Sequence, residues 1–355
     1  MGKIIVTGVS GQDGSYMSDF LLKETPHLVY GVVRRSSKPN YSNISEALKN
    51  ERFKLVTADL SDSQSIENII REIQPDYFLN FAAQSFVGAS WQIPELTFDV
   101  GALGVLRCLE AIRKFTPNCR FYSAGSSEEM GDVIYSPQDL NHPIRPRSPY
   151  GAAKAAARHI TKVYRESYNL YAIHSILYNH ESERRGEEFV TRKISKGVAR
   201  ICKSIQRGEN FLPIELGNIN SKRDWSHSKD FMKGVWLMMN QETPKEYILS
   251  SGETHPISEF VEKAFSEAGI EGFWQGLGVD EKYYLANHIH EEFPNMDSCL
   301  VSVNEAFYRP AEVSLLLGDS SEIRRELGWK PEISFEELVR LMVNFDRSQL
   351  ELTEK

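Results

Sequence analysis

The sequence predicts a protein of the α/β class, in which a doubly wound parallel sheet is followed by a smaller, mixed α/β lobe. Short apolar runs such as Lys3–Thr7 and Leu28–Val33 are typical of strands buried on both faces of a parallel sheet. Helical patterns lie between these runs, and such alternation indicates a doubly wound sheet of the Rossmann type. After residue 178 the alternation loosens. The smaller lobe is expected there, over the carboxyl edge of the sheet, where ligands of such sheets bind.

The expected elements can be placed along the whole chain. Ser148 and Pro149 mark one helix start, because serine suits the N-cap and proline the first helical position. Strands are expected at 3–7, 28–33, 53–57, 77–81, 120–123 and 172–178, and helices at 15–24, 63–73, 96–115, 149–168, 190–205, 257–268 and 335–344. We expect a cofactor-binding domain of 1–178 together with 216–240, and a second lobe of 179–215 and 241–345. The stretch 272–299 has the weakest pattern and is expected to be an insertion or flap.

Composition narrows the classes of function. The net charge of -8 and pI of about 5.7 argue against a protein that binds nucleic acid through a broad basic face. The four cysteines form no C-x-x-C pair, which fits a reducing compartment. No apolar run approaches the roughly 20 residues that span a bilayer, so a cytoplasmic protein is expected. His288 and His290 lack convincing carboxylate partners, and we expect no metal site.

A glycine-rich turn follows the first expected strand. Gly8 allows a tight turn, Gly11 lets a pyrophosphate approach the backbone, and Gly14 lets the next helix pack closely on the sheet. The start of that helix would face the phosphates with free N–H groups and its positive end. Three glycines alone also fit an ordinary turn, but their position after a buried first strand predicts a dinucleotide site.

The residues after the second expected strand bear on the choice of cofactor. An enzyme that uses NAD would usually have Asp or Glu here, whereas this chain has Arg34 and Arg35 followed by serines, the first of them Ser36. Guanidinium and hydroxyl groups suit a 2′-phosphate, which predicts NADP. The alternative is an exposed basic turn. The adenine is expected to border Asp59 and Leu60.

Tyr150 and Lys154 stand four residues apart in the helix that begins at Pro149, so they share one face. A nearby ammonium group and a positive nicotinamide ring would both lower the pKa of the Tyr150 phenol from its usual value near 10. Such a tyrosine can take a proton from a sugar hydroxyl. The Y-x-x-x-K pattern alone is weak, but after a glycine turn and a fifth strand it predicts redox chemistry.

Ser126, Ser127 and Glu128 follow the expected strand at 120–123. A serine at this place can hydrogen-bond the reacting hydroxyl, and by itself it indicates only redox chemistry or epimerisation. A carboxylate can also remove an acidified hydrogen next to a ketone and then help a hydroxyl leave as water. The alternative is that Glu128, beside Glu129, is a solvated loop acid.

Taken together, these residues resemble the GDP-mannose 4,6-dehydratase family, within the extended short-chain dehydrogenases/reductases. The resemblance runs through most of the chain. Its carrying segments are Gly8–Gly14 continued by Ser15 and Tyr16; Arg34 to Ser37; Ala82 to Ser85 with Val87 and Ser90; Ser127-Glu128; Arg147 to Lys154; Asn179 to Ser182; Arg185-Gly186; Phe189 to Ile194; Lys222 to Trp225; and Tyr308 to Val313.

The resemblance implies a role for each matched position. Tyr150 would be the base for C4 oxidation, Lys154 its partner on the nicotinamide ribose, and Glu128 the base at C5, with Ser126 where the family usually has threonine. Further cofactor contacts are implied at Gly8, Gly11, Gln12, Asp13, Gly14, Arg34, Arg35, Ser36, Asp59, Leu60, Ala82, His180 and Arg185. Substrate contacts are implied at Ser85, Ser127, Asn179, Val190, Lys193, Gly217, Arg223, Arg309 and Glu312. For Arg223 and Arg309, ion pairing with neighbouring surface acids is the alternative. A homo-tetramer, or a dimer, is also implied, because the Arg34–Arg35 loop of such proteins reaches a neighbouring subunit.

The chain departs from the family pattern beside these residues. Ser123 and Gly125 stand where Gln and Ser are expected, Glu129 and Met130 replace a hydrophobic–aromatic pair, and 272–299 is longer. These changes surround the hexose and bear on which GDP-sugar is accepted, for instance a manno-heptose. A nucleotide-sugar 4-epimerase or 4-keto reductase, which needs no carboxylate at 128, and a non-catalytic NADP-binding protein are the alternatives.

Overall fold

The computed structural model describes residues 1–286, 298–308, 313 and 315–352. Seven strands form one sheet in the order β11-β6-β5-β4-β1-β2-β3, and every neighbouring pair is parallel. The strands are β1 (Lys3–Thr7), β2 (Leu28–Val33), β3 (Phe53–Thr57), β4 (Tyr77–Asn80), β5 (Arg120–Ala124), β6 (Ala172–Leu177) and β11 (Ile248–Leu249). The predicted doubly wound Rossmann sheet is confirmed, with its chain order reversing between β1 and β4.

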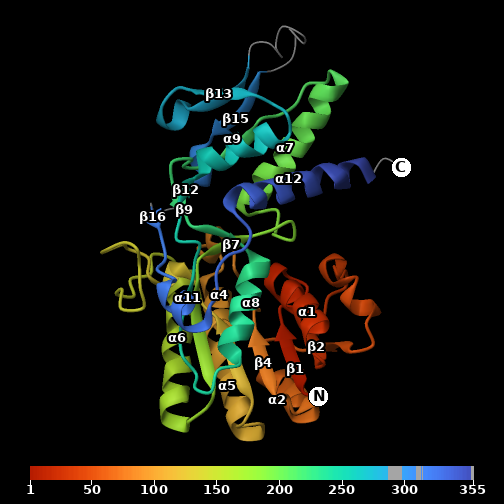
Figure 1. Ribbon diagram of the computed structural model, residues 1–355, viewed down its shortest axis with the longest axis vertical. Coiled ribbons are helices and arrows are strands. Elements are labelled where there is room, and N and C mark those ends of the chain that lie inside the picture. The colour runs from red at the N-terminus through yellow and green to blue at the C-terminus, as the bar shows by residue number, and fades with distance from the viewer. Residues whose placement is uncertain (287–297, 309–312, 314, 353–355) are drawn as a thin grey trace.

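Helices cover both faces of this sheet (Figure 1). Helices α1 (Gln12–Glu24) and α8 (Ser228–Met239) pack together on one face, while α2 (Ser63–Ile73), α5 (Gly104–Phe115) and α6 (Pro149–Tyr168) cover the other. Strand β1 shows how the two faces are filled. Ile4 and Val6 belong to the core under α1 and α8, and Ile5 belongs to the core under α2 and α5, because alternate side chains of a strand point to opposite faces.

Two helix boundaries differ from expectation. Helix α1 begins at Gln12, three residues early, because Gly11 already acts as the N-cap and its carbonyl accepts from Ser15 N. The single helix expected at 96–115 is α4 (Pro94–Phe98), a π-helical turn (Asp99–Leu103) and α5. Gly101 lies inside that turn, where an added Cβ would be 3.1 Å from Ala153 Cβ. The glycine therefore permits close packing on α6, and π-helical turns are found where a helix is locally adjusted.

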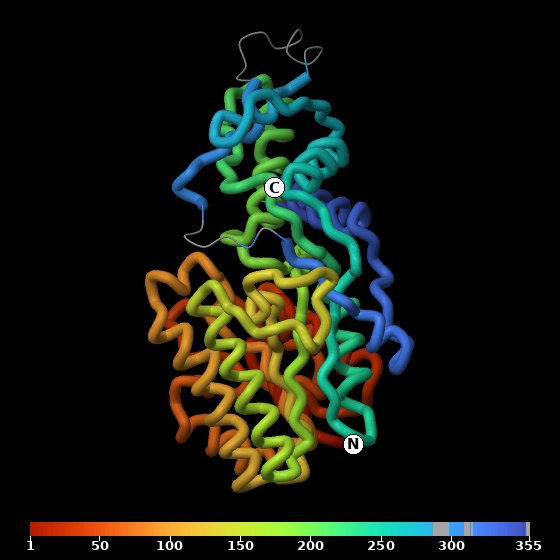
Figure 2. Tube along the Cα trace, turned by 90° about the vertical axis from the view of Figure 1, so that its left-hand side faces the viewer, coloured from red at the N-terminus to blue at the C-terminus, as the bar shows by residue number. Residues whose placement is uncertain are grey.

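The second lobe has its own core. It contains α7 (Val190–Arg207), α9 (Ile257–Glu267), α12 (Phe335–Leu352) and a four-stranded sheet of β13 (Gly272–Gln275), β14 (Lys282–Leu285), β15 (Cys299–Val303) and β8 (Ile214–Leu216). The stretch expected to be an insertion forms the hairpin β13–β14, and its residues 287–297 lie outside the described residues. Figures 1 and 2 show this mixed lobe above one end of the seven-stranded sheet, as predicted.

Short elements join the two parts. They are the pair β7 (Asn179–Glu181) and β10 (Trp225–His227), and the three-stranded sheet of β12 (His255–Pro256), β9 (Lys222–Arg223) and β16 (Leu315–Leu316). Two short helices belong to the first part: α3 (Val87–Ser90) packs on α6, and α11 (Ser321–Leu327) packs on β11. Single 3₁₀ turns occur at Ser42–Ile44, Ala47–Lys49, Ser127–Glu129, Gly278–Asp280 and Glu305–Phe307. No helix among the described residues is both long enough and apolar enough to cross a bilayer.

The expected domain boundaries stay a prediction, and we propose one extension of the first domain. Leu249 of β11, Ile323 of α11 and Trp329 share a core with β1 and α1. Residues 248–249 and 321–329 therefore pack with the parallel sheet rather than with α7, α9 and α12.

Candidate active site

The glycine turn has the geometry that its sequence predicts. Gly8 follows β1 with a φ of 64°, a left-handed conformation that favours glycine. Gly14 lies in the first turn of α1, where an added Cβ would be 2.4 Å from Gly8 O and 2.8 Å from Val9 Cα. Gly11 N donates to Gly8 O over 2.9 Å. The turn thus brings α1 so close to β1 that only glycine fits at position 14, and it leaves the start of α1 facing the pocket.

Side chains at the start of α1 are bonded to the second half of the chain. Gln12 Nε2 donates to His180 O over 3.0 Å, and Ser182 Oγ donates to Gln12 Oε1 over 2.7 Å. Asp13 lies 2.9 Å from His180 Nε2 and accepts from Ser228 Oγ over 2.8 Å. Burial raises the pKa of Asp13, but the combined effects of His180, Arg185 and Ser228 lower it more, so the net shift is downward. Gln12, Asp13 and His180 border the pocket, and these bonds brace the glycine turn against β7 and α8.

The basic segment after β2 contributes unequally to the pocket. Arg34, Arg35 and Ser36 are all exposed, which agrees with the alternative interpretation of this segment as a basic surface turn. Arg34 nevertheless lines the pocket, as do Asp59 and Leu60 after β3, whereas Arg35 and Ser36 do not. Within a single chain, this segment therefore contributes one guanidinium, that of Arg34, to the pocket.

Helix α6 positions Tyr150 and Lys154. Ser148 caps it by accepting from Gly151 N over 3.0 Å, and Pro149 occupies the first turn. Lys154 is buried, donates to Ala124 O over 2.6 Å, and holds its Nζ 5.9 Å from the centre of the Tyr150 ring. The expected shared face is confirmed, and the helix is bonded to the end of β5.

The expected lowering of the Tyr150 pKa is wrong for the protein chain by itself. Burial raises the pKa of this phenol more than Ser126 and Arg185 lower it, and the carboxylates of Glu128 and Glu129 raise it further. Burial also lowers the pKa of Lys154 to about 8, against an opposing effect of Glu129. Both shifts favour the neutral forms, because a buried charge loses its hydration.

The turn after β5 carries the remaining candidate groups. Ser126 begins it as an N-cap, and its hydroxyl accepts from Glu128 N over 3.3 Å. Ser126 N donates in turn to Glu129 Oε1 over 2.8 Å. Glu128 is only 8% exposed and lines the pocket with Ser126 and Ser127. The alternative of a solvated loop acid at Glu128 is therefore wrong.

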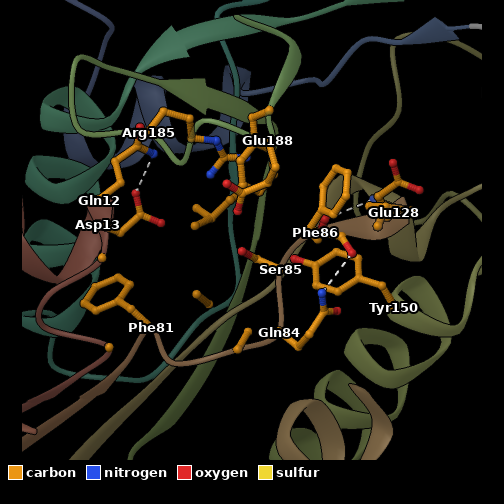
Figure 3. Close-up of a pocket in the computed structure, with 18 of the residues that line it drawn as sticks. Gln12, Asp13, Phe81, Gln84, Ser85, Phe86, Glu128, Tyr150, Arg185 and Glu188 are labelled. Atoms are coloured by element: carbon orange, nitrogen blue, oxygen red, sulfur yellow. Dashed lines mark hydrogen bonds between the residues drawn. The ribbon is translucent and has the colours of Figure 1, made fainter. Parts of the chain in front are cut away.

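One cavity of about 760 Å³ joins the glycine turn to the second lobe. In Figure 3, Gln12, Asp13 and Arg185 border one side, and Tyr150, Phe86 and Glu128 lie together on the other. Of the predicted residues, the cavity is lined by Gly8, Gly11, Gln12, Asp13, Gly14, Arg34, Asp59, Leu60, Ala82, Ser85, Ser126, Ser127, Glu128, Tyr150, Lys154, Asn179, His180, Arg185, Val190, Lys193, Gly217 and Arg223. Arg309 and Glu312 lie outside the described residues.

Several lining residues were not anticipated. Phe307 lies under Lys193, whose Nζ is 3.6 Å from the ring centre, and Phe189 lies 3.5 Å from the guanidinium carbon of Arg185. Phe86 also lines the cavity and contacts the Phe189 ring. Phe86 and Phe307 belong to segments without periodicity, so the sequence carried no signal for them. Phe189 begins a segment that carries the family resemblance, but no role had been assigned to it. Glu188 was likewise missed.

Residues suited to metal binding do not gather in the described part of the chain. No group of three or more His, Cys, Asp or Glu side chains is placed there to hold an ion. His288 and His290 lie outside the described residues.

A doubly wound sheet, a glycine turn and a Tyr–Lys pair beside one long cavity define the class of extended short-chain dehydrogenases/reductases, which bind a nicotinamide dinucleotide at such a turn. The family model described as GDP-mannose 4,6 dehydratase matches residues 5–342. The chain belongs to the GDP-mannose 4,6-dehydratase family.

Relatives from distant organisms match over nearly the whole chain. The GDP-mannose 4,6-dehydratase of Vibrio cholerae serotype O1 is 43% identical over 354 residues, which are 97% of this chain and 93% of the relative. The Drosophila melanogaster protein is 44% identical, covering 96% and 85% of the two chains. The human protein is 42% identical, covering 96% and 90%.

Solved structures share the fold at lower identity. UDP-glucuronic acid 4-epimerase from Bacillus cereus aligns with a TM-score of 0.78 at 17% identity, covering 98% of this chain and 99% of that one. The protein RMD from Pseudomonas aeruginosa, complexed with NADPH, aligns with a TM-score of 0.73 at 20% identity, covering 98% and 100%.

Proposed function

We propose that the protein converts GDP-mannose to GDP-4-keto-6-deoxymannose with NADP as its cofactor. The reaction oxidises C4, eliminates water across C5 and C6, and reduces C6. One observation supports dehydration in particular: the buried carboxylate of Glu128 lies on the same short turn as Ser126 and lines the same cavity as Tyr150. A 4-epimerase or 4-keto reductase has no use for this carboxylate.

The cofactor cradle fits a dinucleotide. Gly8 and Gly14 leave no room for a Cβ, and the start of α1 faces the cavity. When bound, NADP supplies hydride exchange with C4 and C6, together with a positive ring that favours the Tyr150 phenolate. Tyr150 would take the proton of the C4 hydroxyl, with Ser126 hydrogen-bonding that oxygen. Lys154, bonded to Ala124 O, would hold the nicotinamide ribose.

Glu128 would perform the elimination. Once C4 is a ketone, the C5 hydrogen is acidic, and the carboxylate would remove it as a proton. The same carboxyl group would then protonate the C6 hydroxyl, which leaves as water. The proton taken from C5 therefore departs in the water, and Glu128 returns to its ionised form. Return of hydride to C6 would be accompanied by delivery of a proton to C5, and this proton balances the one that Tyr150 took from the C4 hydroxyl.

The proposal includes NADP rather than NAD, because a guanidinium at Arg34 suits a 2′-phosphate and no acidic residue takes its place. The GDP moiety would contact Asn179, Val190, Lys193, Gly217 and Arg223, which line the second-lobe end of the cavity. Arginine suits a diphosphate through two parallel hydrogen bonds.

We also propose a homo-oligomer, a tetramer or a dimer, in the cytoplasm. Contiguous exposed apolar side chains usually mark protein interfaces. Large exposed apolar side chains that do not line the cavity are present in the segment from α3 to α5 and on α6, namely Trp91, Phe98, Leu103, Val163 and Tyr168. Arg35 is exposed and outside its own chain's cavity, which leaves it available to a neighbouring subunit. None of the four cysteines forms a disulfide among the described residues, in keeping with a reducing compartment.

One experiment tests the proposal. The purified protein is incubated with NADP and, separately, with GDP-mannose, GDP-manno-heptose and a dTDP-sugar, and loss of water is followed by mass spectrometry. We expect dehydration of GDP-mannose. Turnover of another substrate only would overturn the specificity, and isomerisation without loss of water would favour an epimerase. A protein inert to every sugar would favour a non-catalytic NADP-binding role.

A further inference from the structure

A buried acid–base pair lies beneath the turn that carries Ser126 and Glu128. Glu129 and His174 are both fully buried, and Glu129 Oε1 lies 2.8 Å from His174 Nε2. His174 belongs to β6, 45 residues away in the chain. Neither residue lines the cavity, so neither is placed to touch the substrate. Burying such a pair removes water from both polar groups, which costs free energy, so we expect the pair to perform a role.

Two of the residues that depart from the family pattern meet here: Glu129, which belongs to the pair, and Gly125, which leaves room for it. An added Cβ at Gly125 would be 2.4 Å from His174 Nε2 and 2.8 Å from Glu129 Oε1. The serine expected at position 125 would therefore collide with the pair. Glu129 and Gly125 form one packing unit with His174, and this unit lies between β6 and the turn.

Glu129 also controls the shape of the turn. The same Oε1 that meets His174 accepts from Ser126 N over 2.8 Å, and the Ser126 hydroxyl accepts from Glu128 N. The Glu129 carbonyl accepts from Arg145 N over 3.2 Å. A single carboxylate thus bonds β6 on one side and the start of the turn on the other, so it ties the position of Ser126 and Glu128 to the sheet.

The charge of Glu129 acts on α6 as well. Its carboxylate raises the pKa of both Tyr150 and Lys154. The other charged groups facing this region are Glu128 on the turn, Asp13 on α1, Arg185 after β7, and Glu246, which pairs with Arg158 and Arg165 of α6 and interacts with His174. Glu129 is the negative group that Tyr150 and Lys154 have in common on the turn itself.

We propose that Glu129, held by His174, is a positioning residue of this active site, fixing the Ser126–Glu128 turn and placing a negative charge beneath Tyr150 and Lys154. The inference rests on the proposed dehydratase function. It assigns no contact with substrate to Glu129, and it makes the pair a built-in determinant of the pH at which the enzyme works.

The variant Glu129→Gln removes the negative charge but keeps a hydrogen bond, because the amide oxygen can still accept from Ser126 N. Losing the negative charge lowers the pKa of Tyr150 and of Lys154 together. Both limbs of the pH profile of kcat/KM should move to lower pH, by about one unit, the scale expected for buried charges a few ångströms apart. Glu129→Leu also removes the hydrogen bond, and kcat should fall about 10-fold or more at every pH, with KM nearly unchanged.

His174 supplies a second, independent pair of variants. His174→Gln keeps a donor for Glu129 and should retain most of the activity and the pH profile, whereas His174→Leu should behave like Glu129→Leu. Asp346→Asn is the matched control, since Asp346 is a buried carboxylate of the second lobe that is bonded to Arg192 and Ser195 rather than to the turn. It should lower the melting temperature without moving the pH profile.

The outcomes separate the two proposals. A wild-type protein that dehydrates no nucleotide sugar contradicts the function itself. If the wild-type protein does dehydrate a nucleotide sugar, either of two results overturns the positioning role alone. One is an unchanged pH profile in a folded Glu129→Gln variant, and the other is an unchanged kcat in His174→Leu. Should Glu129→Gln fail to fold, the comparison of His174→Gln with His174→Leu decides the matter, because equal kcat in both would contradict the proposal.

Discussion

Lys154 Nζ lies 2.6 Å from the carbonyl oxygen of Ala124, so helix α6 is bonded directly to the last residue of β5. The turn that carries Ser126 and Glu128 starts two residues further on. The proposed C4 base on α6 and the proposed C5 base on the turn therefore share one anchor. Two steps of a reaction on a single sugar ring require such a fixed separation between groups from different elements.

Burial of Lys154 makes the activity sensitive to alkaline pH. Its pKa is lowered to about 8 from an ordinary value near 10.5, and the ammonium form exists below that pKa. We expect kcat/KM to decline as pH rises through about 8 as the charge is lost. In Lys154→Arg the basic limb should disappear, because arginine stays protonated. A basic limb unchanged in that variant would assign it to another group.

Glu128→Gln should abolish formation of the 4-keto-6-deoxy product. The amide keeps the shape of the side chain but cannot take the C5 proton, and loss of a general base typically costs 10²–10⁴-fold in rate, so we expect roughly that loss. NADP affinity should stay the same, since Glu128 lies on the turn after β5 and not on the glycine turn. The measurements are product formation by mass spectrometry and NADP binding by calorimetry. Dehydration at the wild-type rate would refute the role of Glu128.

Arg34→Ala should weaken NADP binding and leave NAD binding nearly unchanged. A charge-assisted hydrogen bond contributes about 1.5–3 kcal/mol, which corresponds to roughly a 10- to 100-fold rise in the Kd for NADP. Lys38→Ala is the control, because Lys38 is exposed on the same segment but does not line the cavity. Equal losses of affinity for NADP and NAD in Arg34→Ala would argue against recognition of the 2′-phosphate.

Gly14→Ala should lower both stability and NADP affinity. Its Cβ would lie 2.4 Å from Gly8 O, and backbone must move to relieve the contact, at a cost of about 1–3 kcal/mol. Gly11→Ala is the comparison, because its Cβ would lie 3.2 Å from the same oxygen and should cost less stability. Thermal unfolding with and without NADP measures both effects. Equal melting temperatures for wild type and Gly14→Ala would contradict the close packing.

Much of the framework could be predicted because its signals are local. The strands β1 and β2 begin and end where their apolar runs do, and α6 begins at Pro149 after the Ser148 cap. The tight turn at Gly8 was predicted from its place after a buried strand, and its positive φ agrees. In each case the physical cause of the feature lies in a few residues that are adjacent in the chain.

Other features depend on residues distant in the chain. The pairing of Glu129 with His174 needs β5 and β6 to lie side by side, and the ring of Phe307 meets Lys193 only when β15 pairs with β8. The rise that burial causes in the Tyr150 pKa of the protein chain by itself was missed, because burial is a property of the assembled lobes.

By itself, the sequence determined the alternation of strands and helices over the first 178 residues, the glycine turn, and the spacing of Tyr150 and Lys154, since each follows from neighbouring residues. Only the tertiary structure decided that Glu128 lines a cavity, that Glu129 and His174 form a buried pair beside its turn, and that burial shifts the pKa values of Tyr150 and Lys154 toward their neutral forms. The physical reason is that burial and electrostatic environment are set by every element packed around a group, and most of those elements lie far from it in the chain.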